Sequence, residues 1–157
     1  MSDTGRILLV TVGRRVDPAV SAMAEEYRRR LPPQWQWTWI RVSEASGSLP
    51  PNEVMVREGQ RILEEVAGRL IVALDEEGRE DDSAAFAERF QHLLELGRPL
   101  ALVVGGAFGL SDAVLSRAQH RWSLSKLTFP HQLVPLLVAE QLYRAHTILT
   151  DHPYHKP

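Results

Sequence analysis

The sequence contains no cysteine, no long apolar run and no strong excess of charge of one sign. The lack of cysteine excludes disulfide bonds and thiolate metal sites. No apolar run approaches the roughly 20 residues that a helix needs to span a bilayer. Residues 1–10 include an acidic residue and a short apolar run, with no basic segment or cleavage site. We therefore expect no secretory signal, no membrane association and a cytoplasmic protein.

The remaining composition is that of an ordinary globular domain. The chain has 157 residues, of which 44% are hydrophobic and 24% charged, so it is long enough to bury one core. It shows no repeat, low-complexity tract or interdomain linker. We expect a single domain over residues 1–157.

The net charge of −2 argues against a nucleic-acid partner, because proteins that hold a large RNA surface alone usually have a basic domain. The charges are unevenly placed, however. Residues 113–139 contain no carboxylate, and five basic or titratable side chains lie there: Arg117, His120, Arg121, Lys126 and His131. A local positive field is compatible with this pattern, so composition leaves an RNA partner open.

Short apolar runs alternate with longer stretches that have helical character. Strands are expected over residues 7–12, 70–74 and 100–104, and the alternating Trp35, Trp37 and Trp39 predict a further strand with one aromatic face. A charged turn, residues 75–78, is expected to end the second of these strands. Helices are expected over residues 17–31, 52–67, 83–96 and 132–149, with another capped by Ser111 or Asp112. The alternation predicts an α/β fold with a mainly parallel sheet and flanking helices.

A glycine-rich turn follows the strand expected at residues 100–104. Gly105, Gly106 and Gly109 do not have the spacing of the dinucleotide fingerprint, and no Gly-Lys-Ser/Thr of a phosphate-binding loop follows. A strand, a glycine turn and a helix in succession present backbone N–H groups at the carboxyl edge of a parallel sheet. Alone, the turn fits a ligand site or a tight chain reversal.

The segment 122–131 and the helix after it carry the next candidate side chains. Pro130 rigidifies a turn, and His131 after it is a candidate base, hydrogen-bond donor or helix-start residue. Glu140 and Arg144 are spaced for an ion pair on one face of the helix.

The tail, residues 151–157, combines Tyr154 with His152 and His155. Chain ends of this kind usually fray, yet this one is rich in functional groups. No third ligand stands at metal-binding spacing, so we expect no metal site.

In order and spacing, these segments resemble the RlmH family, ribosomal RNA pseudouridine-N3-methyltransferases of the SPOUT class. The similar segments are Leu102–Leu110 (LVVGGAFGL), Trp122–His131 (WSLSKLTFPH), Val138–Ala145 (VAEQLYRA) and Asp151–His155 (DHPYH). The resemblance extends more weakly over the rest of the chain. It implies an α/β fold whose C-terminal segment forms a trefoil knot, which general topology rules would not propose.

The resemblance also implies that S-adenosyl-L-methionine is the cofactor, bound at the knot. Carried over position by position, the cofactor residues are Leu74, Gly105, Gly106, Leu124, Ser125, Lys126, Leu127, Thr128, Phe129 and Pro130. Backbone donors and apolar walls at strand ends suit an adenine and a polar amino-acid end without a phosphate.

The family resemblance further implies a homodimer whose active site is completed by the partner, and methylation of a pseudouridine in 23S ribosomal RNA on assembled ribosomes. An imide nitrogen is a poor nucleophile while protonated, so a base or a cation beside it is needed. We expect Arg144, Tyr154 and His155 to be the catalytic residues. His131, Glu140 and His152 are expected to contact the substrate, with Glu140 orienting Arg144.

Two departures from the family pattern stand out. Pro135 stands where the family has an arginine, and Ala107 and Phe108 are more apolar than the pair usual there. Two related readings therefore stay open, a SPOUT methyltransferase for another RNA base and a non-catalytic RNA- or ribosome-binding relative. A dinucleotide oxidoreductase is disfavoured, because both the fingerprint and its ribose-binding acid are missing.

Overall fold

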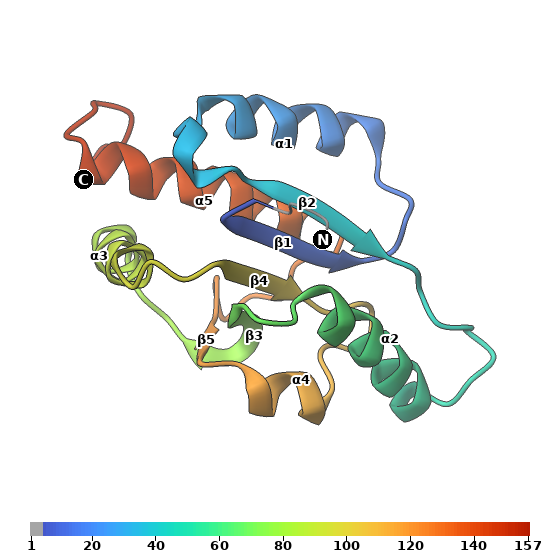
Figure 1. Ribbon diagram of the computed structural model, residues 1–157. Helices are drawn as coiled ribbons and strands as arrows, with labels where there is room; N and C mark the ends of the chain where they lie inside the picture. The colour runs from blue at the N-terminus through green and yellow to red at the C-terminus, as the bar shows by residue number, and fades with distance from the viewer. Residues whose placement is uncertain (1–4) are drawn as a thin grey trace.

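Apolar runs of the chain form the buried centre of one parallel sheet. The computed structural model describes residues 5–157, and its strands are β1 (Ile7–Val12), β2 (Thr38–Val42), β3 (Leu70–Arg79), β4 (Leu100–Val104) and β5 (His120–Trp122). They lie in the order β2-β1-β4-β3-β5, and every neighbouring pair is parallel (Figure 1). Such a sheet is covered on both faces, which is why β1 and β4 are buried along their whole length.

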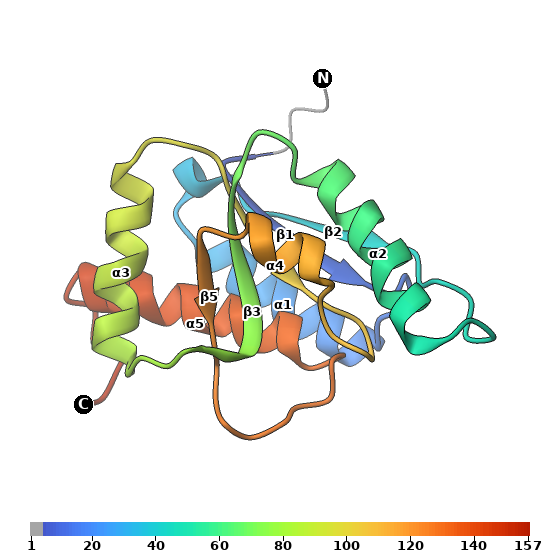
Figure 2. The ribbon, with the colours of Figure 1, turned by 90° about the horizontal axis from the view of Figure 1, so that it is seen from below.

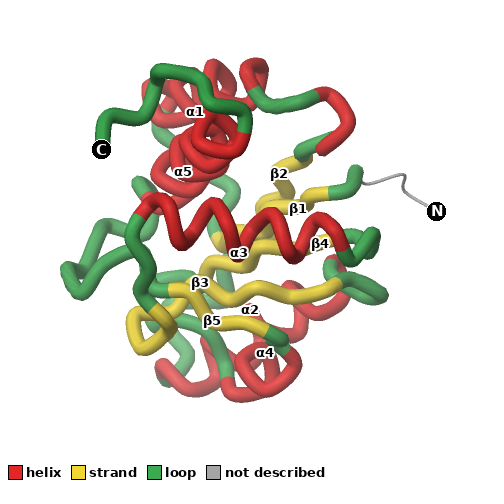
Figure 3. Tube along the Cα trace, turned by 90° about the vertical axis from the view of Figure 1, so that its left-hand side faces the viewer, coloured by secondary structure: helices red, strands yellow, loops and turns green. Residues whose placement is uncertain are grey.

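Helices cover both faces of this sheet. They are α1 (Pro18–Arg30), η1 (Pro33–Trp35, a 3₁₀ turn), α2 (Pro51–Glu65), α3 (Ser83–Glu95), α4 (Asp112–Arg117) and α5 (Val134–Leu149). Helices α1, α3 and α5 cover one face, and α2 and α4 cover the other, which is nearest the viewer in Figure 2. Figure 3 shows the sheet between the two layers. Ile7 and Leu9 of β1 pack in the first core, whereas Leu8 and Val10 pack in the second.

The structure confirms the α/β class, the parallel sheet and the flanking helices, and the four long helices lie within two residues of their predicted bounds. The trefoil knot stays a prediction. Within residues 5–157 no helix is both long and apolar enough to cross a membrane. The first four residues of the N-terminal stretch, where we expect no secretory signal, lie outside the described residues.

The predicted strand through all three tryptophans is wrong. Trp35 ends the 3₁₀ turn η1, Gln36 after it has a left-handed backbone (φ 45°), and β2 begins only at Thr38. The reason is the proline pair before Trp35, because Pro33 sits at the start of the turn and proline favours that position. Trp35 and Trp37 are each buried, but they do not share a strand face.

The predicted end of the second strand is also wrong. Strand β3 does not stop at Leu74 but continues to Arg79. Leu74 and Arg79 both pair with Trp122 of β5, so the register shifts between them. A Cβ atom at Gly78 would lie 2.7 Å from the backbone carbon of Arg121, so this pairing requires glycine. Strand β5 was not predicted, because three residues are too few to show a period.

An aromatic cluster between α3, α5 and the sheet anchors the first core. Phe90 of α3 is fully buried, and its ring lies edge-on to Trp35 at 5.3 Å and to Trp122 at 6.3 Å between centroids. Such pairs add to the free energy gained by burying the rings. The cluster ties the η1 turn to β5, the strand that leads into the segment 122–131.

Phe90→Ala is expected to lower the free energy of unfolding by about 3 to 5 kcal/mol, because it opens a cavity that rigid neighbours cannot fill. Urea unfolding followed by tryptophan fluorescence measures the change. The control is Leu96→Ala just after the same helix, where the side chain is 60% exposed and the change should stay within about 0.5 kcal/mol. Equal losses in the two variants would contradict this account of the core.

Candidate functional site

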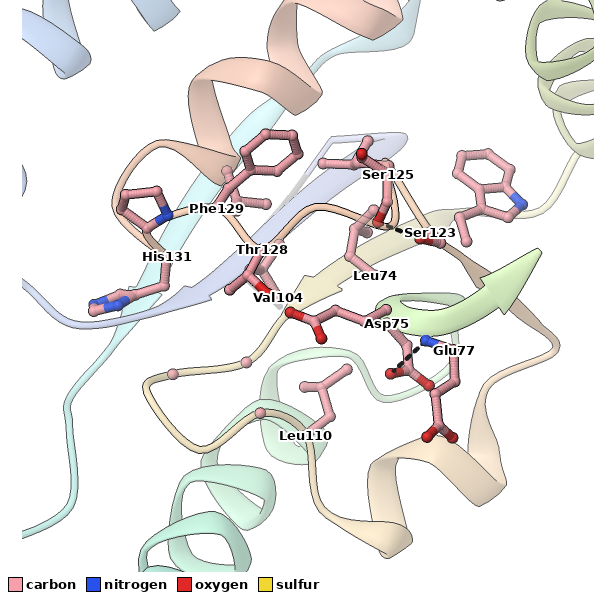
Figure 4. Close-up of a pocket in the computed structure, with 18 of the residues that line it drawn as sticks. Leu74, Asp75, Glu77, Val104, Leu110, Ser123, Ser125, Thr128, Phe129 and His131 are labelled. Atoms are coloured by element: carbon pink, nitrogen blue, oxygen red, sulfur yellow. Dashed lines mark hydrogen bonds between the residues drawn. The ribbon is translucent and has the colours of Figure 1, made fainter. Parts of the chain in front are cut away.

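A pocket opens at the carboxyl edge of the sheet, where parallel strands bring their ends together. Its volume is about 640 Å³. Four segments line it: the outer part of β3, the glycine turn after β4, the loop between β5 and α5, and the first residue of α5 (Figure 4). These segments are distant in the chain, so the parallel topology is what creates the pocket.

The two ends of the glycine turn lie so close together that its first position has no room for a side chain. A Cβ atom at Gly105 would lie 2.5 Å from the backbone carbon of Gly109. The Gly109 N–H donates to the carbonyl oxygen of Gly106 at 3.1 Å, and Gly109 itself has a positive φ of 84°. Glycine is therefore required at residues 105 and 109 to expose backbone on the wall of the pocket.

The opposite wall is the loop between β5 and α5, and its own serines hold it in shape. The Ser123 hydroxyl donates to the Ser125 carbonyl oxygen at 2.9 Å, and the Ser125 hydroxyl accepts from the Leu127 N–H at 3.0 Å. The Ser123 N–H donates to the Arg79 carbonyl oxygen at 2.9 Å and so joins the loop to β3. Thr128 and Phe129 follow on the same wall (Figure 4).

The pocket lining is acidic on one side. Asp75, Glu76 and Glu77 line it, and Asp75 lies 3.9 Å from the guanidinium of Arg121. Every lining residue is in the described part of the chain, and none of them is lysine or arginine. A ligand that carries positive charge and a flat apolar group suits this lining better than a phosphate does.

Nine of the ten residues predicted to bind the cofactor line this one pocket. Lys126 is the exception, since it is exposed and is not among the lining residues. His131, predicted to contact the substrate, also lines the pocket. The three acidic residues of β3 were not predicted, although their place after a buried strand at this edge of the sheet could have suggested them.

A second group of side chains gathers where α5, α1 and the tail meet. We call it the Arg144 cluster: Tyr27, Glu140, Arg144, Tyr154 and His155. The Arg144 guanidinium donates to Glu140 Oε1 from Nε at 3.0 Å and from Nη2 at 2.5 Å. The Tyr154 hydroxyl donates to the same oxygen at 3.0 Å. One carboxylate oxygen therefore joins the helix to the tail.

The contacts within the cluster fix the protonation of Arg144 and Tyr154. The hydrogen bond with Glu140 raises the pKa of Arg144, so this side chain stays cationic. Burial, with the hydrogen bonds to Tyr27 and Glu140, raises the pKa of Tyr154 far above its usual range, so its hydroxyl stays protonated. His155 Nδ1 lies 3.1 Å from Arg144 Nη1. A guanidinium only donates, so His155 Nδ1 accepts this hydrogen bond. His155 must therefore break its contact with Arg144 before Nδ1 can take up a proton.

Tyr27 is the member that sequence reasoning missed. Its hydroxyl lies 3.4 Å from that of Tyr154, and its ring is 5.9 Å from that of Tyr143. Nothing in the local pattern of α1 signals this role, because the contact joins residues 127 positions apart. His152, predicted to contact the substrate, accepts from the Tyr154 N–H at 3.2 Å and lies exposed in the tail.

The pocket and the Arg144 cluster are separate within one chain. Val134 lines the pocket, and Arg144 lies ten residues further along the same helix. A helix rises 1.5 Å per residue, so the two positions are about 15 Å apart along its axis. The predicted catalytic residues thus lie together, but not beside the pocket of their own chain. Pro135 is buried in the first turn of α5 and leaves the helix start intact.

Known proteins are similar to this chain over nearly its full length. Residues 6–155 match the model of a family described as predicted SPOUT methyltransferase. The chain is 44% identical to ribosomal RNA large subunit methyltransferase H of Methylococcus capsulatus, over 94% of this chain and 97% of the relative. It is 42% identical to the protein of that name from Thioalkalivibrio sulfidiphilus, over 96% and 99%.

Solved structures show the same fold. A probable methyltransferase from Bordetella pertussis Tohama I has a TM-score of 0.57 at 17% identity, over 92% of this chain and 98% of that one. A putative methylase family protein from Neisseria gonorrhoeae has a TM-score of 0.56 at 15% identity, over 100% and 89%. The resemblance inferred from the sequence motifs is thereby confirmed: the chain belongs to the family of ribosomal RNA large subunit methyltransferase H, within the SPOUT methyltransferases.

Proposed function

We propose that this chain is a single-domain, cytoplasmic methyltransferase that transfers a methyl group from S-adenosyl-L-methionine to N3 of a pseudouridine in 23S ribosomal RNA. Assembled ribosomes are the proposed substrate, and the working unit is a homodimer. The relatives named ribosomal RNA large subunit methyltransferase H support the reaction and the RNA. The observation that carries the proposal is the acidic pocket at the sheet edge. Helix α5 begins at this pocket and also carries Arg144, which is held by hydrogen bonds to Glu140.

The pocket residues fit the proposed cofactor. The carboxylates of Asp75, Glu76 and Glu77 complement a ligand with a sulfonium and an ammonium group. The loop supplies apolar surface for an adenine at Leu124 and Phe129. The sulfonium supplies a methyl group already activated for transfer, so the protein mainly aligns the donor with the acceptor.

The Arg144 cluster fits the acceptor. Loss of the N3 proton leaves negative charge on the base, and a fixed cation beside it lowers the energy of that state. Arg144 supplies the cation, and its bonds to Glu140 hold it in place without reorganisation. Tyr154 stays protonated and therefore donates a hydrogen bond rather than accepting a proton. His155 accepts a proton at Nδ1 only after breaking its contact with Arg144.

A homodimer explains why pocket and cluster are apart in one chain, since the cluster of one protomer then faces the pocket of its partner. Exposed apolar side chains at the pocket favour a covered surface: Phe108 is 50% exposed and Leu127 71%, and both line it. Leu133, just before α5, is 40% exposed. Each copy also contributes a carboxylate-free segment, residues 113–139, so a locally basic surface is compatible with the net charge of −2 on each chain.

The reaction is tested by mass spectrometry of ribosomal RNA from cells that lack the chain. A methylated pseudouridine should disappear from 23S RNA and return when the gene is restored. A methyl group lost from a different base would support another SPOUT specificity instead. An unchanged modification pattern, with no methyl transfer in vitro, would favour the non-catalytic relative.

Arg144→Ala is expected to lower the methylation rate by about a hundredfold or more, because a fixed cation at the developing charge is removed. Cofactor affinity, measured by calorimetry with S-adenosyl-L-methionine, should not change. The assay follows labelled methyl transfer to ribosomes from cells lacking the chain. Arg28→Ala is the matched control, since Arg28 is also paired with a glutamate on its own helix, Glu25. Full activity of Arg144→Ala would remove Arg144 from the mechanism.

Gly105→Ala is expected to abolish cofactor binding, because the added methyl group would displace the backbone at Gly109. Mixing this variant with Arg144→Ala tests the shared site. If each site uses one pocket and the partner's Arg144, the re-associated mixture should recover about a quarter of wild-type activity, since half of the dimers are mixed and each has one intact site. No recovery from a mixture shown to contain mixed dimers would place the whole site in one chain.

A further inference from the structure

A buried carboxyl group behind the pocket has no role in the site described so far. Glu58 of α2 is only 4% exposed. Its Oε2 accepts from the Ala45 N–H at 3.1 Å, whereas its Oε1 has no hydrogen-bond partner among the described residues. A buried carboxyl group with one satisfied oxygen lowers stability, so its presence calls for an explanation.

The unpartnered oxygen lies directly behind the glycine turn of the pocket. A Cβ atom at Gly106 would be 2.8 Å from Glu58 Oε1 and 3.2 Å from Val12 Cγ1. Gly106 therefore packs against this carboxyl group on the side where a side chain would be, and the turn also lines the pocket. Glu58 thus limits how far the turn can move away from a ligand.

The next residue of α2 holds the far end of the same turn. A Cβ atom at Gly59 would lie 2.3 Å from Ser111 Oγ and 3.3 Å from Val114 Cγ2. Ser111 caps α4, since its side chain accepts from the Val114 N–H. The glycine turn runs from residue 105 to this cap, so Glu58 and Gly59 contact both of its ends from one turn of helix.

We propose that Glu58 is a positioning residue of the cofactor pocket, which together with Gly59 holds the turn Gly105–Ser111 in its ligand-binding shape. The inference rests on the proposed function only in naming S-adenosyl-L-methionine as the ligand. Glu58 itself does not line the pocket, whereas Gly106, whose Cβ position faces Glu58 Oε1, does. It links α2, the segment at Ala45 and the glycine turn through one carboxyl group.

The surroundings of Glu58 favour the neutral form of its carboxyl group more than water does. Burial raises its pKa above the ordinary 4.5, and the negative charge of Glu44 acts in the same direction. The Ala45 N–H, Arg61 and His131 act in the opposite direction, but burial is the largest effect. A neutral carboxyl group with one unpartnered oxygen costs less than a buried charge does.

Calorimetric titration with S-adenosyl-L-methionine tests the proposal. Glu58→Ala should weaken cofactor binding by about tenfold to a hundredfold, because the turn loses its backing and its geometry. Glu58→Gln keeps the shape without the charge and should bind within about twofold of wild type. Ile62→Val, a buried apolar change on the same helix, loses stability without removing a polar group and should bind normally.

Two further variants keep the test informative if Glu58→Ala does not fold. Glu58→Asp withdraws the carboxyl group by one methylene and should weaken binding while Glu58→Gln does not. Gly59→Ala should also weaken binding, because its methyl group displaces Ser111, whereas Gly47→Ala, in open space, should not. Normal binding by Glu58→Asp and Gly59→Ala would overturn the inference. Failure of the wild type to bind would instead overturn the proposed function, and this inference with it.

The pH dependence of unfolding separates positioning by a neutral carboxyl group from simple space filling. A folded-state pKa above the unfolded value stabilises the fold below pH 4.5, and this stabilisation is lost as pH rises through the raised pKa. Glu58→Gln should lack that loss, while the matched variant Glu64→Gln, exposed on the same helix, should keep it. Identical profiles for wild type and Glu58→Gln would show that folding does not raise the pKa of Glu58, which contradicts a neutral buried carboxyl group.

Discussion

The pairing of β4 between β1 and β3 is the constraint on which the rest of the structure depends. All three strands run the same way, and β1, β4 and residues 70–73 of β3 are buried, so their carboxyl ends meet at one edge with both faces covered. The chain must turn away there, and glycine allows it to do so within a few atoms of itself. The pocket is thus a consequence of burying the sheet, and its lining comes from the middle of β3 and from the segments that follow β4 and β5.

Sequence patterns predicted the centre of the molecule better than its edges. The runs at β1 and β4 have the length and composition of buried strands, and Ser111, one of the two caps expected for α4, does cap it. Prediction failed where distant residues decide the outcome. Strand β3 continues beyond Leu74 because Gly78 lets β5 approach. The error at Trp35 has a local cause instead, since the prolines just before it begin the 3₁₀ turn.

The candidate site was likewise predicted only in part from the sequence. The glycines and the loop 124–130 were predicted through motifs, because they are contiguous in the chain. Glu58 and Tyr27 were not, since each acts through a contact that only the folded chain creates: Glu58 behind Gly106, and Tyr27 beside Tyr154. In both cases an α-helix on the outside of the sheet fixes a group that no motif includes. Residues that support a site in this way need a structure to be found.

Helix α5 acts as a spacer, with the pocket at its first residue and Arg144 ten residues later. Each residue of a helix turns the chain by about 100°, so one inserted residue would rotate Arg144 to another face as well as move it outward. The length of this segment is therefore under a geometric restriction that does not apply to the exposed turn at residues 46–48. Natural insertions and deletions among such chains should collect in loops of that kind and avoid residues 134–144.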